Sequence, residues 1–336
     1  MNNNRFDCAL FDIDGVLVDI RKSYNEAIKK TVEFVLEEAT GSKRYRGLVT
    51  DQLILRFRQS GGFNNDTDIS YAIALAVLAS SNKNSSNNDG GSPSPAIEKK
   101  GGGAARARRF LFQVAQNADE TGITAVEKFL STSSYDISRY KEMLAYPAPV
   151  RDSYIGRVFD ELFYGPELFR KQNGLEPAYC IPKRPLIAND RLAVSARTLK
   201  ELHSRLGGNK LAIVSGRSRL AAEYSLSPVM QYFNMDACVF LEDEPREHAK
   251  PNPYAVKKAM SEMKASTAIY AGDSTEDMLM ARRAQKENGC RIAFVGIYGM
   301  SPEPARNAKK FKEQGAEAVA KSVNGLPAAM KKLLSR

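Results

Sequence analysis

The sequence predicts an α/β fold: a doubly wound, Rossmann-like parallel sheet with an inserted α-helical domain. Three observations support this. Short apolar runs alternate with helical patterns after about residue 190, a further apolar run lies at residues 8–11, and the block between them carries helical patterns alone. Continuous apolar strands that alternate with helices are typical of a parallel sheet covered on both faces.

The composition is that of a globular protein rather than a membrane protein. The 336 residues are 43% hydrophobic and 26% charged, which is enough for one large domain or two smaller ones. No apolar run approaches the length of a membrane span, and residues 1–6 lack the apolar core of a signal peptide. We therefore expect a cytoplasmic protein that does not bind membranes.

The cysteines and the net charge limit the classes of partner. The four cysteines are scattered without CxxC spacing, so we expect reduced packing residues. The net charge of +10 favours anionic ligands. The basic residues are dispersed and no nucleic-acid-binding module accompanies them, so a phosphate ester is expected rather than nucleic acid. The oligomeric state is not predicted.

The first apolar run ends in two carboxylates. Asp12 and Asp14 are two residues apart and Gly15 follows them. On an extended strand such residues point the same way. Like charges this close raise each other's pKa unless a cation lies between them. The pattern suits a bound Mg²⁺, an acyl-phosphate nucleophile, or both.

The next block is predicted to be a helical domain over residues 21–188. Residues 68–78 are apolar almost all round, which indicates a helix buried inside a bundle. Residues from about 80 to 104 are low in complexity and are predicted to be a mobile insertion. The other helices are predicted at residues 23–38, 50–59, 106–116, 125–130, 153–162 and 165–172.

Residues 1–20 and 189–336 are predicted to form the α/β domain. Its later strands are expected at residues 210–217, 237–241, 268–273 and 291–296, and its helices at residues 192–206, 218–226, 254–263, 277–287 and from 326. In such a sheet the functional groups lie at the carboxyl ends of the strands. Those ends carry Asp12 and Asp14, Ser215 and Arg217, and Asp273, which predicts a single site.

Four short motifs resemble those of the haloacid dehalogenase (HAD) superfamily, in the same order. They are Asp12-x-Asp14-Gly-Val, Ser215-Gly-Arg217, Lys250-Pro and Gly272-Asp273-Ser-x-x-Asp277. The first motif alone is weak, but four at the expected strand ends are specific. The motif-bearing part covers about half of the chain, and the helical block looks like the C1-type cap of the first subfamily.

The resemblance implies a Mg²⁺-dependent phosphatase that acts on a small phosphorylated metabolite through an aspartyl-phosphate. It implies that Asp12 is the nucleophile and that Asp14 is the general acid and base. It further implies that Lys250 neutralises charge. Ser215 would offer its hydroxyl, and nearby helix N-terminal amides, to a phosphoryl oxygen.

The same resemblance implies the metal ligands. Asp12, Asp273 and the backbone carbonyl of Asp14 would bind Mg²⁺, while Asp277 would hold a metal-bound water or support the other ligands. Asp273 and Asp277 could instead serve only to cap and stabilise the following helix, and Ser215 could be a plain turn residue.

Substrate contacts are expected from two segments. One is Gly216 with Arg217, although Arg217 could equally form a surface salt bridge. The other is the loop at residues 61–66, where Phe63, Asn64 and Asn65 are candidates. Asn65 or Asp66 could instead cap the following helix. The loop also resembles a little-characterised group of the first subfamily near histidine biosynthesis, which makes histidinol phosphate one candidate substrate.

Other activities remain open to different degrees. A phosphomutase or another phosphotransferase of the superfamily is an alternative. Asp14 argues against the dehalogenases, which resemble the first motif without its second aspartate. No lysine of the helical block is marked by the apolar context that a phosphonatase needs. A non-catalytic interaction protein with a basic surface is the alternative from another class.

Overall fold

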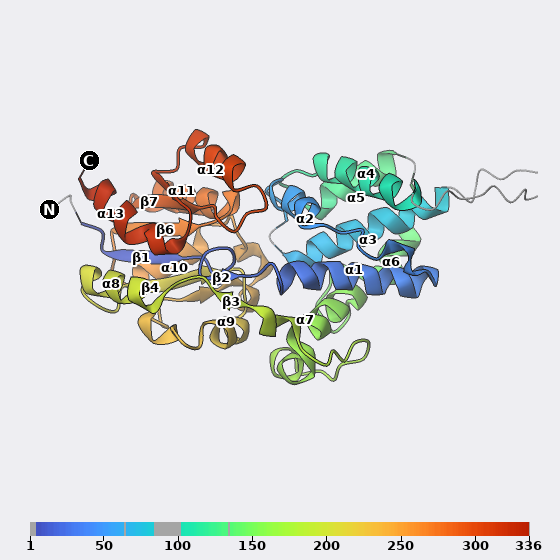
Figure 1. The fold of residues 1–336 in the computed structure, drawn as a ribbon, viewed down its shortest axis with the longest axis horizontal. Coiled ribbons are helices and arrows are strands. Elements are labelled where there is room, and N and C mark those ends of the chain that lie inside the picture. Colours follow the sequence, from blue (N-terminus) through green and yellow to red (C-terminus); the bar gives the residue numbers. More distant parts are fainter. Residues whose placement is uncertain (1–4, 64, 84–101, 134, 336) are drawn as a thin grey trace, which may run out of the picture. The chain divides into compact units, whose positions relative to one another are not determined.

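The computed structural model describes residues 5–63, 65–83, 102–133 and 135–335. The chain divides into two compact units, residues 1–20 with 189–336 and residues 21–188, and each is described here by itself. Figure 1 traces the elements of both. Most of the predicted insertion at residues 80–104 lies outside the described residues.

The first unit contains a six-stranded parallel sheet (Figure 1), which confirms the predicted α/β class. Its order is β5-β4-β1-β6-β7-β8. The four longest strands are buried almost throughout, as their continuous apolar sequences predict. The strands are β1 (Cys8–Phe11), β4 (Leu211–Ser215), β5 (Val239–Phe240), β6 (Thr267–Gly272), β7 (Arg291–Ile297) and β8 (Ala318–Ala320).

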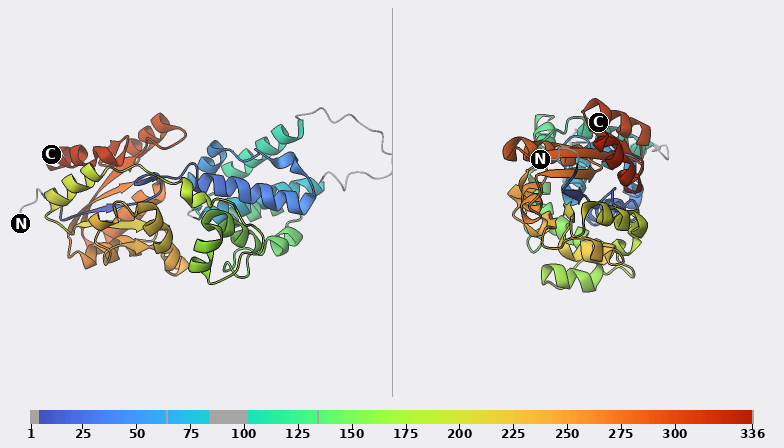
Figure 2. Two further views of the ribbon diagram at one scale, coloured as in Figure 1. Left: turned by 60° about the horizontal axis from the view of Figure 1, so that its bottom comes forward. Right: turned by 90° about the vertical axis from the view of Figure 1, so that its left-hand side faces the viewer.

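Helices cover both faces of this sheet (Figure 2). The strand order steps in opposite directions on the two sides of β1, so right-handed connections place α8 and α9 on one face and α10 and α11 on the other. The contact of α10 with α11 agrees with this placement. These helices are α8 (Ala196–Leu206), α9 (Arg219–Leu226), α10 (Tyr254–Glu262), α11 (Thr275–Asn288), α12 (Pro304–Glu313) and α13 (Leu326–Leu334).

A short antiparallel pair lies where the chain leaves and re-enters this unit. β2 (Val18–Asp19) pairs with β3 (Arg191–Leu192). The predicted helix at residues 192–206 is therefore too long at its start. It begins only at Ala196, because the hydroxyl of Ser195 caps it by accepting from the amide of Thr198.

The second unit is helical, as predicted for the inserted region. Its central helix α3 is buried on all sides, in agreement with its uniformly apolar sequence. The two helices predicted at residues 153–162 and 165–172 are both present within α7, where the non-helical backbone of Gly165 separates them. The helices are α1 (Tyr24–Thr40), α2 (Asp51–Arg58), α3 (Asp66–Lys83), α4 (Gly102–Gln116), α5 (Ile123–Thr132), α6 (Ser138–Leu144) and α7 (Tyr154–Asn173).

Short 3₁₀ helices complete the secondary structure of both units. They are η1 (Lys43–Tyr45), η2 (Leu186–Asn189), η3 (Met230–Tyr232), η4 (Leu241–Asp243), η5 (Arg246–His248) and η6 (Val323–Gly325). Among all helices of the described residues, none combines the length and apolar character that crossing a bilayer requires.

A buried carboxylate fixes the segment that follows α7. Glu161 is fully buried, and its oxygens accept from the amides of Ala178, Tyr179 and Cys180 at 2.6 to 2.7 Å. The Nε of Arg157 lies 3.1 Å from the same carboxylate. Because a buried charge without partners is costly, this carboxylate and its donors must fold together.

Glu161→Gln is expected to lower the free energy of unfolding by about 3 kcal/mol, because the neutral amide offers only one oxygen to donors that a carboxylate satisfied with two. Urea denaturation would measure this. The matched control is Glu176→Gln, whose side chain is 74% exposed and pairs with Arg170 at the surface. It should change stability by less than about 0.5 kcal/mol. Equal losses in both variants would contradict this role for Glu161.

Candidate active site

The site is built at the carboxyl ends of three neighbouring strands. Asp12 follows β1, Ser215 is the last residue of β4 and Asp273 follows β6. β1 lies between the other two, and the amide of Asp12 donates to the carbonyl of Ala271 at 3.0 Å. The strand order reverses at β1, and ligands of doubly wound sheets bind at such a point.

A buried ammonium group connects two of the carboxylates. The Nζ of Lys250 lies 2.9 Å from an oxygen of Asp12 and 2.7 Å from Oδ1 of Asp277. Burial alone would lower the pKa of Lys250, but its attraction to Asp12 and Asp277 outweighs that effect and raises the pKa above its usual range. The ammonium is therefore charged, and the three side chains form one ionic unit.

Asp277 also accepts hydrogen bonds from donors other than Lys250. Its Oδ1 also accepts from the hydroxyl of Tyr270 at 3.0 Å, and its Oδ2 accepts from the hydroxyl of Ser274 at 2.8 Å and from the amides of Asp273 and Ser274. In return, Ser274 accepts from the amide of Asp277, which completes a capping box at the start of α11. The capping interpretation of Asp277 therefore holds together with its contact to Lys250.

Asp12 is nearly inaccessible and electrostatically crowded. Burial is the main cause that raises the pKa of Asp12, to about 7. Repulsion from Asp277 and Asp14 acts in the same direction, and the attraction of Lys250 opposes both. An additional cation beside Asp12 would relieve this repulsion.

Gly15 allows the first motif to approach Asp273. Its φ of +72° is in the left-handed region, and a Cβ at this position would collide with the Asp273 carboxylate. The loop after Asp14 is tight, since the amide of Gly15 donates to the carbonyl of Val18 at 2.9 Å. Any larger residue would displace the Asp273 side chain.

The carboxylates fit a hard divalent cation. Asp12, Asp273 and Asp277 each offer an oxygen, and these atoms lie within 4.8 Å of one another. Carboxylate oxygens are the ligands that Mg²⁺ prefers. Asp277 is the least suited to bind the ion directly, because both of its oxygens already accept from several donors. It is better placed to orient Lys250.

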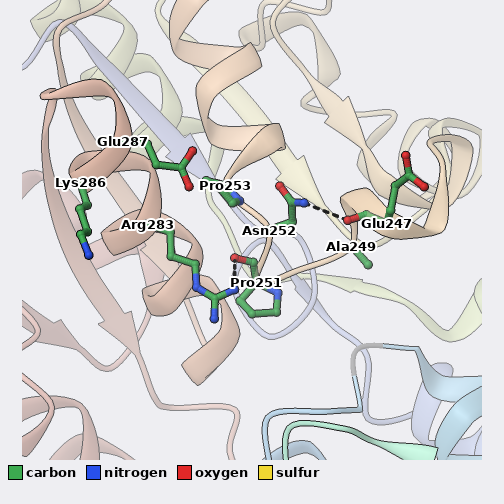
Figure 3. Close-up of a pocket in the computed structure, with 8 residues that line it drawn as sticks. All are labelled: Glu247, Ala249, Pro251, Asn252, Pro253, Arg283, Lys286 and Glu287. Atoms are coloured by element: carbon green, nitrogen blue, oxygen red, sulfur yellow. Dashed lines mark hydrogen bonds between the residues drawn. The ribbon is translucent and has the colours of Figure 1, made fainter.

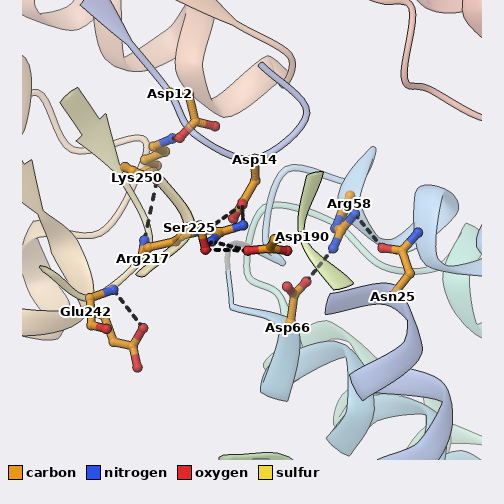
Figure 4. Close-up of polar contacts among 12 residues, drawn as sticks. Asp12, Asp14, Asn25, Arg58, Asp66, Asp190, Arg217, Ser225, Glu242 and Lys250 are labelled. Carbon is orange, nitrogen blue, oxygen red and sulfur yellow. Dashed lines mark hydrogen bonds and ion pairs between the residues drawn. The ribbon is translucent and has the colours of Figure 1, made fainter. Parts of the chain in front are cut away.

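Arg217 is 1% exposed, so the alternative that it forms a surface salt bridge is wrong. Its contact with a substrate stays a prediction. Its Nε and Nη2 each lie 2.6 Å from Oδ1 of Asp14. Its Nη1 lies 2.7 Å from Asp190 and 2.8 Å from Ser225 (Figure 4). Asp190 and Ser225 were not predicted as site residues, because neither lies in a motif.

The other residues of the second motif differ in exposure. Ser215 is fully buried and accepts the amide of Arg217 at 3.5 Å, whereas Gly216 is exposed.

The amides of Ser218 and Arg219 at the start of α9 donate to Glu242 and Asp243, respectively. The expectation that helix N-terminal amides face a phosphoryl oxygen is thus wrong for these two groups, which acidic side chains already occupy.

The loop at residues 61–66 provides less of a ligand site than predicted. The ring of Phe63 is 2% exposed and packs edge-on against Phe57 at 5.0 Å, so it has no open face for a substrate. Asn65 accepts the amide of Thr67, which agrees with the capping alternative. Asn64 lies outside the described residues. Within this helical unit, Arg58 pairs with Asp66 at 2.7 Å (Figure 4).

One pocket of about 720 Å³ lies beside the loop that carries Lys250 (Figure 3). Arg283 donates to the carbonyl of Pro251 at 3.3 Å along its wall. None of the predicted site residues lines it, so it does not mark the catalytic centre. Its lining residues are Glu247, Ala249, Pro251, Asn252, Pro253, Arg283, Lys286 and Glu287.

Comparison with known proteins identifies one family. The model of the haloacid dehalogenase-like hydrolases matches residues 6–285. A search of curated proteins finds no match.

Solved structures share the fold. Phosphatase Tt82 from Thermococcus thioreducens is 20% identical, with a TM-score of 0.54, covering 92% of this chain and 99% of its own. A structural-genomics target is 17% identical with a TM-score of 0.61, and the match covers 98% of this chain and 99% of the target. A phosphonoacetaldehyde hydrolase-like protein from Oleispira antarctica is 13% identical with a TM-score of 0.50, and the match covers 98% of this chain and 93% of that protein. At these identities the likeness concerns the fold alone.

Asp12→Asn is expected to stabilise the protein in EDTA at pH 8, because it removes a buried carboxylate whose pKa is raised to about 7. A raised pKa means that ionised Asp12 disfavours the native state, so wild-type stability should fall as pH rises from about 4 towards 7. Melting temperatures across this range would test it. The advantage of the variant should shrink towards pH 5, and an advantage that grows on acidification would contradict the prediction.

Gly15→Ala is expected to abolish Mg²⁺ binding, because its Cβ would displace the Asp273 carboxylate. Titration calorimetry would measure the binding. Gly41→Ala is the matched control: its φ is +65°, but among the described residues no atom beyond its chain neighbours lies within 4 Å of the place that its Cβ would take. Each variant should lose about 1 kcal/mol of stability through backbone strain, while only the first should lose the metal. Unchanged binding in Gly15→Ala would contradict the close approach.

Proposed function

Since the chain belongs to the haloacid dehalogenase-like hydrolases, we propose that it is a Mg²⁺-dependent phosphatase that hydrolyses a small organic phosphate monoester through an aspartyl-phosphate. The ionic unit of Asp12, Lys250 and Asp277 carries this proposal. It pairs a carboxylate that can attack phosphorus with a cation that can neutralise the developing charge. The name of the similar Thermococcus phosphatase supports the same reaction class.

In the first step, a carboxylate oxygen of Asp12 attacks the phosphorus and the ester P–O bond breaks. The leaving oxygen takes a proton from the carboxyl group of Asp14 and departs as an alcohol. Lys250 holds the nucleophile in place and offsets the charge of the phosphoryl group, because its ammonium lies 2.9 Å from Asp12. Ser215 would orient a phosphoryl oxygen through its hydroxyl.

In the second step, water attacks the phosphorus of the aspartyl-phosphate. Asp14 accepts a proton from this water, the bond between Asp12 and phosphorus breaks, and inorganic phosphate leaves. The sum of both steps converts ester and water into alcohol and phosphate, and returns both aspartates to their starting states.

Asp12, Asp273 and the backbone carbonyl of Asp14 would hold Mg²⁺, and Asp277 would keep Lys250 in position. When bound, the ion would supply charge neutralisation to the transferring phosphoryl group. The crowding that raises the pKa of Asp12 supports a cation at this point. The leaving alcohol is left open, with histidinol phosphate as one candidate ester.

The proposal predicts that p-nitrophenyl phosphate is hydrolysed with Mg²⁺ and that EDTA removes the activity. Asp12→Asn should lower kcat by at least about 10⁴-fold, because the amide cannot form the acyl-phosphate. Release of free phosphate would measure turnover. The matched control Asp236→Asn changes an exposed aspartate outside the motifs and should keep wild-type rates.

Two results would count against this function. Activity that survives EDTA unchanged would exclude the metal-dependent route. Conversion of a sugar phosphate to its isomer without phosphate release would favour the phosphomutase alternative.

A further inference from the structure

We propose that Arg217, anchored by Asp190 and Ser225, is a positioning residue that fixes the carboxylate of Asp14 for proton transfer. This inference rests on the proposed phosphatase function and adds a set of residues that the four motifs do not assign to proton transfer. Figure 4 shows the chain of contacts from Asp14 through Arg217 to Asp190.

The guanidinium is engaged on both sides. Two of its nitrogens, Nε and Nη2, lie 2.6 Å from the same oxygen, Oδ1 of Asp14. The third, Nη1, lies 2.7 Å from Oδ2 of Asp190 and 2.8 Å from the hydroxyl of Ser225. The planar, rigid fork of an arginine thereby transmits the position of Asp190 to Asp14.

The anchor is itself rigid. The side chain of Asp190 is 4% exposed and that of Arg217 is fully inaccessible. The hydroxyl of Ser225 donates to Oδ2 of Asp190 at 2.5 Å, which closes a ring of three polar groups. Asp190 directly precedes β3 and Ser225 lies in α9, so two separate elements hold the guanidinium. A buried charge network of this kind has one favoured geometry.

The guanidinium holds Asp14 by one oxygen, because Nε donates to Oδ1 at 2.6 Å and Nη2 lies 2.6 Å from the same atom. The side chain of Asp14 is 27% exposed while that of Arg217 is inaccessible, so an inaccessible guanidinium anchors a carboxylate that solvent can reach. A general acid works only when its proton lies within hydrogen-bond reach of the leaving group.

The test compares two substrates that differ in their need for an acid. An alkyl phosphate needs its leaving oxygen protonated, whereas p-nitrophenyl phosphate has a stable leaving group. The value of kcat/KM reports the steps up to ester cleavage. Arg217→Met should lower it about 100-fold for the alkyl phosphate and about 5-fold or less for the aryl phosphate. Arg217→Lys should recover part of the loss.

The double variant with Asp14→Asn gives a second readout. If Arg217 acts through Asp14, Arg217→Met should cost little further activity once Asp14 is Asn. Equal losses for both substrates, or fully additive losses in the double variant, would overturn the proposal.

Destabilisation is controlled separately. Arg157→Met removes an arginine that pairs with the buried Glu161 in the helical unit. It should lower stability without changing the ratio of kcat/KM between the two substrates.

If Arg217→Met does not fold, Asp190→Asn and Ser225→Ala loosen the anchor while keeping the guanidinium, and should show a smaller selective loss of the same kind. An unchanged ratio in both would overturn the proposal. A wild-type protein inactive on both esters would instead refute the phosphatase function and this inference with it.

Discussion

The ammonium of Lys250, buried between Asp12 and Asp277, is the interaction on which the site depends. Strand ends of a parallel sheet bring carboxylates together, and without a cation their repulsion and desolvation would oppose folding. Lys250 lies 2.9 Å from one carboxylate and 2.7 Å from the other, which allows both to be buried. Burial still raises the pKa of Asp12. The protein therefore neutralises Asp12 only in part, which agrees with the metal ion and the phosphate that we propose to bind there.

A second buried cation, the guanidinium of Arg217, pairs with the other carboxylate of the first motif. Arg217 contacts Asp14, and Lys250 contacts Asp12, so two aspartates only two residues apart belong to separate ionic units. This separation gives a physical basis for the two roles that we propose, attack on phosphorus by Asp12 and proton transfer by Asp14. Gly15 follows directly and leaves room for the Asp273 carboxylate. One short segment therefore contains both aspartates and the glycine that admits Asp273.

The sequence predicted the α/β class and the convergence of the motifs because both depend on local patterns: apolar strands, and polar residues at their ends. It did not predict the burial of Arg217, since Asp190 and Ser225 are ordinary residues that only the fold brings beside it. The sequence pattern also could not predict whether a side chain in a short loop points inward or outward. Phe63 turns inward against Phe57, although glycines and polar residues surround it in the sequence. Tertiary packing decided these cases.

The central claim is that the Asp12 carboxylate becomes phosphorylated during turnover. Mass spectrometry of acid-quenched protein, mixed with Mg²⁺ and p-nitrophenyl phosphate, tests it most directly. Asp14→Asn should slow hydrolysis of the intermediate and let it accumulate. A phosphoryl group on the peptide that contains residues 8–19, absent when Asp12 is also replaced by Asn, is the predicted result. Phosphate release by the wild-type protein, with no trace of this adduct in Asp14→Asn at any quench time, would contradict it.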